Sequence, residues 1–239
     1  RQMCIRDSPG AGRFVNFYYN GTDIYNDVSV NYCVHEMFAE KQADTLVIRF
    51  NDTKGIWSKW QPAAGDTVRF KEGASDTGKM FIHSMKPENG LFTIRAMSMP
   101  KTAKIRKSKS WEGVRFLQLA NEFAGNHGLT FKNYGCEDQV YPYIKQSNEG
   151  DFSLFSRLCM LEGCQMLIFD GSLLAYNEHY IEQQEPAGGL TVDENGVFTY
   201  EDNRDTMFGS CEVASGSYSG KYVACLLYTS PSPRDRTRS

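Results

Sequence analysis

The sequence predicts an α+β fold in which antiparallel strands dominate and two helices are confined to one later stretch. Between residues 13 and 97, short runs of strand-forming residues are separated by turn dipeptides such as Asn20-Gly21 and Asn89-Gly90. Two helical patterns of apolar residues follow, over 114–126 and 149–163. Because short sequential strands with tight turns favour closed or stacked antiparallel sheets, we expect a β-barrel or sandwich followed by a small α/β insertion.

The first β region, residues 9–100, contains six runs with the composition of strands. In the second run, Val30, Tyr32 and Val34 alternate with Cys33 and His35, which is the period of a half-buried strand. The expected strands are 14–19, 28–35, 45–50, 67–71, 79–85 and 91–97. The last two are expected to form a hairpin around the Asn-Gly turn between them.

Trp57 and Trp60 lie in a segment of this region that has no strand pattern. The segment ends at Pro62, so we expect a loop there. Residues 98–100, Ser-Met-Pro, mark the end of the β region.

The first helix pattern, 114–126, places Phe116, Leu119 and Phe123 at three- and four-residue spacing on one face. His127 and Gly128 follow, a cation-capable residue and a glycine of the kind that ends helices. We therefore expect an amphipathic helix whose apolar face packs in the core.

The second helix pattern, 149–163, lines Phe152, Phe155 and Leu158 along its apolar side. Asn148 is expected to cap its start, with Asp151 meeting the free amide groups and the positive end of the helix dipole. We expect six side chains to form the core of this unit: Trp111, Phe116, Phe123, Phe152, Phe155 and Leu158.

Short strands are expected around these helices. The expected runs are 129–131, 139–145, 164–169 and 173–176. The last two are joined by Asp170-Gly171, a favoured two-residue hairpin turn. Together the helices and strands define an α/β unit over residues 101–180.

Both ends of the chain resemble translated sequencing-library adapter, and we expect residues 1–8 and 225–239 to be artefact. Between residues 177 and 189 the chain is polar with Pro186 and two glycines, which indicates a linker. Further strands are expected around Asn195-Gly196 and from residue 216 onward, within a last segment that covers 181–224.

Charge argues against a general nucleic-acid binder. The whole chain has a formal charge of −3, of which the two ends contribute +1 and +2, so the remaining body carries −6. Residues 101–109 contain five lysines and arginines. They could meet phosphate in DNA or at a membrane surface, or they could form a solvated linker or edge strand without a ligand. Trp111 beside them is interpreted as a buried anchor.

No catalytic, cofactor or metal constellation is predicted. The four histidines are far apart in sequence and lack the spacing of metal ligands. Cys159 and Cys164 fit neither a zinc knuckle nor a redox pair, and five unpatterned cysteines indicate reduced thiols. Glu149 and Asp151 could act as an acid/base pair in glycan cleavage, but their place at a helix start has the simpler explanation of amide stabilisation.

The α/β unit resembles the phage late control D family, the baseplate hub proteins of contractile phage tails and their type VI secretion relatives. The order and spacing agree from the basic run before Trp111 through residues 146–152 to Gly171. The motif residues are Trp111, Gly113, Gly128, Gln146, Asn148, Glu149, Asp151, Arg157, Leu158 and Gly171. This chain departs from the family in having Gly150 where a serine is usual, and in lacking a capping threonine near Val114.

The resemblance implies a structural protein and not an enzyme. It implies that residues 9–100 are a tube domain, a β-barrel, and that residues 181–224 begin a second tube barrel. In the family the subunit is part of a homotrimer that joins the tail tube, or tube-initiator proteins, to the membrane-piercing spike. The implied location is the virion baseplate after synthesis in the bacterial cytoplasm, with only indirect membrane contact and no specific nucleic acid. A type VI secretion-like spike hub, and a peptidoglycan-directed lysin or wall-binding module, remain alternatives.

Overall fold

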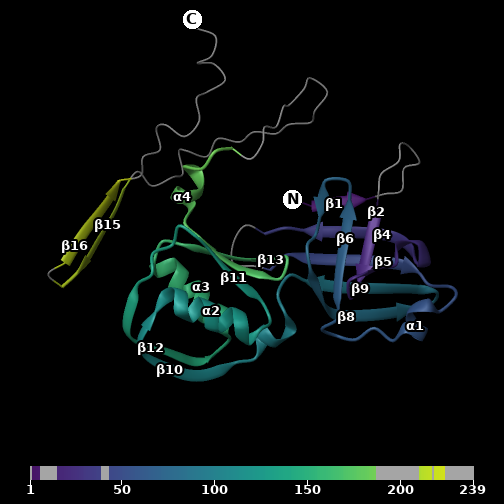
Figure 1. Ribbon diagram of the computed structural model, residues 1–239, viewed down its shortest axis with the longest axis horizontal. Coiled ribbons are helices and arrows are strands. Elements are labelled where there is room, and N and C mark those ends of the chain that lie inside the picture. The colour runs from purple at the N-terminus through teal and green to yellow at the C-terminus, as the bar shows by residue number, and fades with distance from the viewer. Residues whose placement is uncertain (1, 6–14, 39–42, 187–209, 217, 224–239) are drawn as a thin grey trace, which may run out of the picture. The chain divides into compact units, whose positions relative to one another are not determined.

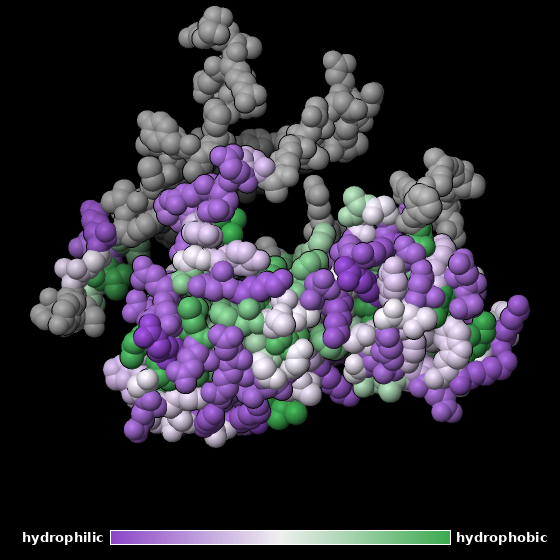
Figure 2. All heavy atoms as spheres, in the orientation of Figure 1, coloured by the Kyte–Doolittle hydropathy of each residue, from purple (hydrophilic) through white to green (hydrophobic). Residues whose placement is uncertain are grey.

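The computed structural model describes residues 2–5, 15–38, 43–186, 210–216 and 218–223. The chain divides into two compact units, residues 1–185 and 186–239, and each is described by itself. Figure 1 shows the elements, and Figure 2 shows that the visible face is mostly hydrophilic, with smaller hydrophobic areas. Within the described ranges, no helix combines the length and apolar character needed to cross a membrane.

Residues 15–100, which we call the sheet domain, contribute to a nine-stranded antiparallel sheet. Its strand order is β1-β4-β5-β9-β8-β6-β2-β3, and β7 pairs with β6. The strands are β1 (Gln2–Ile5), β2 (Val15–Tyr19), β3 (Thr22–Asp23), β4 (Ser29–Glu36), β5 (Thr45–Asn51), β6 (Thr67–Glu72), β7 (Ser75–Asp76), β8 (Met80–Glu88) and β9 (Leu91–Met97). The six predicted strands are therefore all present, and β1 lies in the segment that we expected to be artefact.

The sheet is strongly curved around a single core. Phe17 on β2 and Phe50 on β5 have ring centroids only 5.3 Å apart, although three strands separate β2 from β5 in the sheet. Such an approach requires the sheet to curl back on itself. Among the strands that the structure describes, the end strands β1 and β3 do not pair with each other, so a closed barrel is not confirmed.

The predicted loop at Trp57 is a short helix, α1 (Ile56–Trp60), so the loop prediction was wrong. The Asp52 carboxylate accepts hydrogen bonds from the backbone N–H groups of Ile56 (2.6 Å) and Trp57 (3.4 Å) at its start. Trp57 is 1% exposed and its ring stacks on Phe92, with centroids 5.3 Å apart. Five residues are too few to show a helical period, whereas burial of one large ring is sufficient to fix the turn.

Strand β4 contains a register shift between Val30 and Tyr32. A bulge of this kind reverses the alternation of side chains beyond it. Cys33 and His35 therefore point into the core, and Val34 is only half-buried. The alternation predicts a strand correctly here, but it does not show which residues are buried.

Residues 101–182, which we call the α/β domain, enclose two helices between two small sheets. Figure 1 shows α2 and α3 between the β10–β12 ribbon and the sheet formed by β11, β14 and β13. The elements are η2 (Lys101–Lys104), β10 (Lys107–Arg115), α2 (Phe116–Asn126), β11 (Thr130–Tyr134), β12 (Val140–Glu149), α3 (Asp151–Leu161), β13 (Gln165–Phe169), β14 (Ser172–Tyr176) and α4 (Glu178–Glu182). Strand β11 runs parallel to β14, whereas β13 and β14 form the predicted hairpin.

Five of the six predicted core side chains of this domain are fully buried: Phe116, Phe123, Phe152, Phe155 and Leu158. Trp111 is half-buried, and its ring meets Phe123 edge-on with centroids 5.7 Å apart. The Trp111 indole N–H donates to the Glu122 carboxylate at 3.0 Å. The expected anchor therefore keeps its polar edge near the surface, where Glu122 satisfies it.

The last described elements are a short helix and a hairpin. Helix α4 is capped by Asn177, whose side-chain oxygen accepts from the backbone N–H of Tyr180 at 3.1 Å. In the second unit, β15 (Ser210–Ser215) pairs with β16 (Tyr218–Val223). The hairpin predicted around Asn195-Gly196 lies outside the described residues.

Candidate functional site

Three of the motif residues, Gln146, Glu149 and Asp151, lie close to the point where the chain enters the α/β domain from the sheet domain. The connection runs from β9 through η2 into β10, and β10 pairs with β12 along its length. Gln146 and Glu149 lie on β12, and Asp151 opens α3. The end of α2 lies against the same point through His127. The candidate site is therefore a junction of four elements.

A buried carboxylate, Asp151, is the centre of this junction, and 2% of its side chain is exposed. One oxygen, Oδ2, accepts from Lys107 Nζ at 3.0 Å, from Asn126 Nδ2 at 3.2 Å and from His127 Nε2 at 3.1 Å. The other, Oδ1, accepts from Gln146 Nε2 at 2.9 Å. Four side chains from different parts of the domain thus meet one charge, which satisfies the hydrogen-bonding needs of a buried anion.

The electrostatics of the cluster follow from this geometry. Burial raises the pKa of Asp151, but hydrogen bonds from Gln146, Lys107 and Asn126 outweigh it and hold the pKa below its ordinary value. Burial lowers the pKa of His127, against the opposing attraction of Asp151. A neutral His127 donates from Nε2 to Asp151, so its Nδ1 accepts from the Thr102 hydroxyl at 2.9 Å.

The order of hydroxyl, imidazole and carboxylate in Thr102, His127 and Asp151 also occurs in enzymes that use a nucleophilic hydroxyl. In this chain the carboxylate is additionally neutralised by Lys107 and shared with two amide side chains. Its partners come from β10, β12 and the end of α2, so the contacts hold these elements to the start of α3. We interpret the cluster as a structural contact that holds η2 on the rest of the α/β domain.

The predicted cap of the second helix was wrong. Helix α3 begins at Asp151 with Gly150 as its N-cap, and no side chain caps it. Asn148 still belongs to β12, with a left-handed backbone (φ 49°), and its N–H donates to Ser108 Oγ at 3.0 Å. The Glu149 carboxylate accepts from Arg157 at 2.9 Å, and the Asp151 carboxylate binds side chains. Asp151 lies in the first turn of α3, at the positive end of the helix dipole as expected, but among the described contacts neither acid accepts a hydrogen bond from the helix amides.

The remaining motif residues have backbone or packing positions. Leu158 is buried in the core of the α/β domain. Gly113, Gly128 and Gly171 all have positive φ angles, of 58°, 68° and 71°. At Gly171 this conformation is required by the two-residue turn between β13 and β14, where Asp170 also has positive φ.

Gly150 lies against the backbone of η2. A Cβ atom at this position would lie 2.8 Å from the backbone oxygen of Ala103 in η2. Because the atom that the added methyl group would meet belongs to the backbone of η2, it cannot easily move away. Gly150→Ala is therefore expected to lower the free energy of unfolding by about 1–3 kcal/mol. Gly125→Ala in α2 is the matched control, because no atom lies within 4 Å of its added methyl group, and it should stabilise by about 0.5–1 kcal/mol. Urea denaturation of both variants tests this, and equal effects would contradict the close approach.

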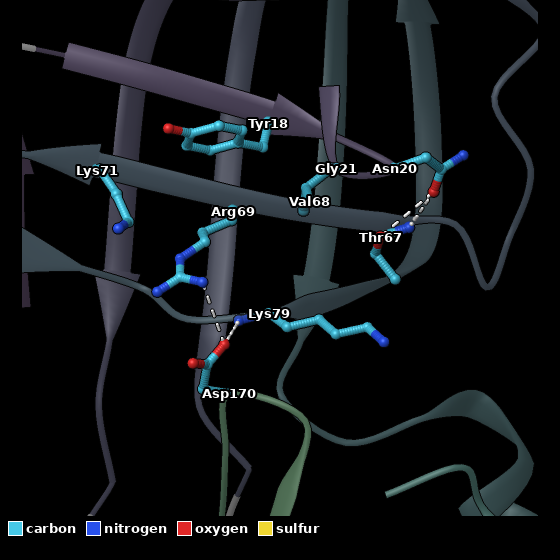
Figure 3. A pocket seen from close by; sticks show the side chains of 9 residues that line it. All are labelled: Tyr18, Asn20, Gly21, Thr67, Val68, Arg69, Lys71, Lys79 and Asp170. Atoms are coloured by element: carbon cyan, nitrogen blue, oxygen red, sulfur yellow. Dashed lines mark hydrogen bonds and ion pairs between the residues drawn. The ribbon is translucent and has the colours of Figure 1, made fainter. Parts of the chain in front are cut away.

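A contact between the two domains lies at the turn between β13 and β14. The Asp170 carboxylate accepts from the backbone N–H of Lys79 at 2.9 Å and lies 3.5 Å from the Arg69 guanidinium. Figure 3 shows these groups at the edge of a hollow of about 570 Å³. Gly78 also has positive φ, and a Cβ atom added at this glycine would lie 3.0 Å from the Cβ of Asp170. The sequence indicated only a hairpin turn here, because nothing local shows what a turn will touch.

The hollow itself is lined by side chains that already have partners. Arg69 makes a double hydrogen bond with Asp76, at 2.8 and 2.6 Å, and Lys71 lies 3.0 Å from the same carboxylate. The hydrogen bond from Arg69 holds the pKa of Asp76 well below its usual range. Among the residues that the structure describes, no group of three or more histidine, cysteine, aspartate or glutamate side chains could hold a metal ion.

Two buried histidines, His35 and His127, and the half-buried His83 predict a pH dependence of stability. Burial lowers the pKa of His35, His83 and His127 in the folded chain. A lowered folded pKa means that the unfolded chain binds protons first, so stability is lost as pH falls below the unfolded value of about 6.5. We expect a lower free energy of unfolding at pH 5.5 than at pH 7.5 by urea titration, with a smaller difference in His127→Gln. Equal stability at the two values would contradict burial of these rings.

Comparisons with known proteins were made for the whole chain. No protein-family model and no curated protein matches it. Solved structures do. A 43 kDa tail protein of prophage MuSo2 from Shewanella oneidensis matches 69% of this chain with a TM-score of 0.53 and 12% identity. A tail protein from Neisseria meningitidis matches 91% (TM-score 0.59, 12% identity), and prophage tail protein gp18 from Listeria monocytogenes matches 88% (TM-score 0.56, 11% identity).

These similarities concern the fold. The chain has the fold of phage and prophage tail proteins, over most of its length. It spans 54% of the Shewanella protein and 68% and 67% of the other two. At 11–12% identity, nothing about partners or activity follows from the comparison alone.

Proposed function

We propose that this chain is a structural subunit of the baseplate hub in a contractile phage tail, where it joins the tail tube to the membrane-piercing spike. The observation that carries the proposal is the likeness of its fold to three tail proteins. The resemblance of the motif residues to the late control D family supports the finer assignment to the hub. The protein then acts in the virion by shape and assembly, without catalysis.

The junction fits such a role. The Thr102–His127 hydrogen bond holds η2 on the end of α2, the Lys107–Asp151 ion pair joins β10 to α3, and the Asp170 turn contacts the sheet domain at Lys79. A part that transmits force between a tube and a spike needs its domains fixed to each other. In this proposal the curved sheet corresponds to a tube barrel, and three copies form a closed ring, for which each copy must offer two different surfaces.

Light scattering coupled to size-exclusion chromatography tests the proposal. The chain is expected to elute with three times the mass of a single copy. A zymogram on peptidoglycan is expected to show no clearing. A monomer at all concentrations would overturn the hub assignment, and clearing that disappears in Glu149→Gln would favour a wall-directed enzyme.

A further inference from the structure

Three buried cysteines belong to the core of the α/β domain: Cys136, Cys159 and Cys164. They are 6%, 1% and 2% exposed, and all three carry free thiols. The structural role proposed above makes no use of them. One of the contacts among them follows from the way a helix ends, whereas the other joins two separate parts of the chain.

Cys159 and Cys164 lie on either side of the turn that ends α3. The backbone N–H of Cys164 donates to the carbonyl of Cys159 at 2.8 Å, and Gly163 before it has a positive φ of 65°. This is the Schellman arrangement, in which the residue after the glycine packs on the last turn of the helix. The nearness of these two cysteines is therefore explained by helix termination alone.

Cys136 reaches Cys164 from a different part of the chain. Strands β11 and β13 flank β14 in register, so the end of β11 and the start of β13 lie on either side of the end of β14. Asn177, just after β14, ties both neighbours together. Its N–H donates to the Tyr134 carbonyl at 2.9 Å, and its side-chain amide donates to the Gly163 carbonyl at 3.3 Å. The turn that carries Cys136 is thereby held beside the turn that carries Cys164.

The two thiols are in direct contact. The Asn133 side chain fixes Cys136, because its oxygen accepts from the Cys136 N–H at 3.0 Å and its amide donates to the Cys136 carbonyl at 2.9 Å. The Cys164 thiol directs its own proton to the Glu162 carbonyl at 3.6 Å. The Cys164 sulfur is thus available as an acceptor, and the Cys136 thiol donates to it. Sulfurs in hydrogen-bond contact need only a short approach, to about 2 Å, to form a covalent bond.

We propose that Cys136 and Cys164 form a reversible disulfide bond in an oxidising medium, which links the turn after β11 to the end of α3. The proposal does not depend on the hub assignment. With oxidised glutathione, one cysteine thiolate attacks the glutathione disulfide and releases one glutathione thiolate. The second cysteine thiolate then attacks the mixed disulfide and releases the other. The protons of the two cysteines end on the two released glutathione molecules, so the chain is oxidised and the glutathione is reduced.

Burial slows this reaction in the folded chain. It raises the pKa of both thiols, which keeps them protonated and unreactive. Tyr180, on the five-residue helix α4, lies against Gly135, the neighbour of Cys136. A helix this short opens more easily than the core does. Cys136, the more exposed of the pair, is therefore the thiol that meets the oxidant first.

Peptide mapping tests the bond. The reduced full chain is treated with oxidised glutathione in the folded state and during refolding from urea, because refolding gives every thiol access to the oxidant. Remaining thiols are then blocked, and the peptides are separated without a reductant. A peptide pair joined through Cys136 and Cys164 is expected after refolding and, more slowly, in the folded chain. It should be absent in Cys136→Ala and present in Cys159→Ala, the matched control from the same core.

Urea denaturation provides a second measurement. The linked chain is expected to unfold at a higher urea concentration than the reduced chain, because the bond restricts the unfolded state. Cys136→Ala should show no such difference between oxidised and reduced samples. Cys136 and Cys164 that both stay reduced after refolding would overturn the proposal, and so would a bond between Cys164 and Cys159. A linked chain that is less stable than the reduced one would show that the fold must distort to join the sulfurs, which would also contradict it.

Discussion

Asp151→Ala is expected to lower the free energy of unfolding by about 3–5 kcal/mol. The Asp151 carboxylate is the common acceptor for Lys107, Asn126, His127 and Gln146. Removing it takes one acceptor from each of these donors, of which Gln146 and His127 are the most enclosed, although Gln146 keeps the Glu149 carbonyl and His127 keeps Thr102. The cost of keeping these donors buried without their hydrogen bond to Asp151, more than the lost ion pair, accounts for the size of the effect.

The measurement is urea denaturation followed by tryptophan fluorescence, since Trp111 reports on the α/β domain. Glu149→Ala is the control, because its partner Arg157 is 53% exposed and surface pairs contribute at most about 1 kcal/mol. If Asp151→Ala lowered the free energy of unfolding by less than about 1 kcal/mol, the four donors would not depend on this carboxylate for stability. That result would also remove the reason to interpret the cluster as what holds η2 and the surrounding elements of the α/β domain together.

The strands and helices were largely predictable because each depends on local signals. The hairpins at Asn89-Gly90 and Asp170-Gly171 follow from dipeptides that tolerate positive φ, which all four residues adopt. The α/β core followed from the spacing of its aromatic residues. The bulge in β4 was not predictable, because its cause is pairing with β5 and not the composition of β4.

The site was predictable only in part. The motif named Gln146 and Asp151, and the structure brings these two together. Lys107, Asn126 and His127 lie in stretches that carry the resemblance, the basic run and the helix end at 124–129, but they were not among the predicted site residues. They lie 24 to 44 positions from Asp151 in sequence. A buried carboxylate needs hydrogen-bond donors, so partners for Asp151 could be expected once its burial is known. The sequence does not show which residues they are, because they lie far from Asp151 along the chain.

Phe155→Ala is expected to cost about 3–5 kcal/mol, because the ring lies at the centre of the α/β core. Phe155 is fully buried, stacks on Phe116 with centroids 5.2 Å apart and meets Phe123 edge-on at 6.2 Å. Truncation removes these contacts and leaves a cavity that the two helices cannot close without moving. Leu161→Ala on the same helix should change stability by less than about 0.5 kcal/mol, since Leu161 is 69% exposed. If the two variants were equally stable in urea, α3 would not pack through its Phe155 face, and the α/β core described above would be incorrect.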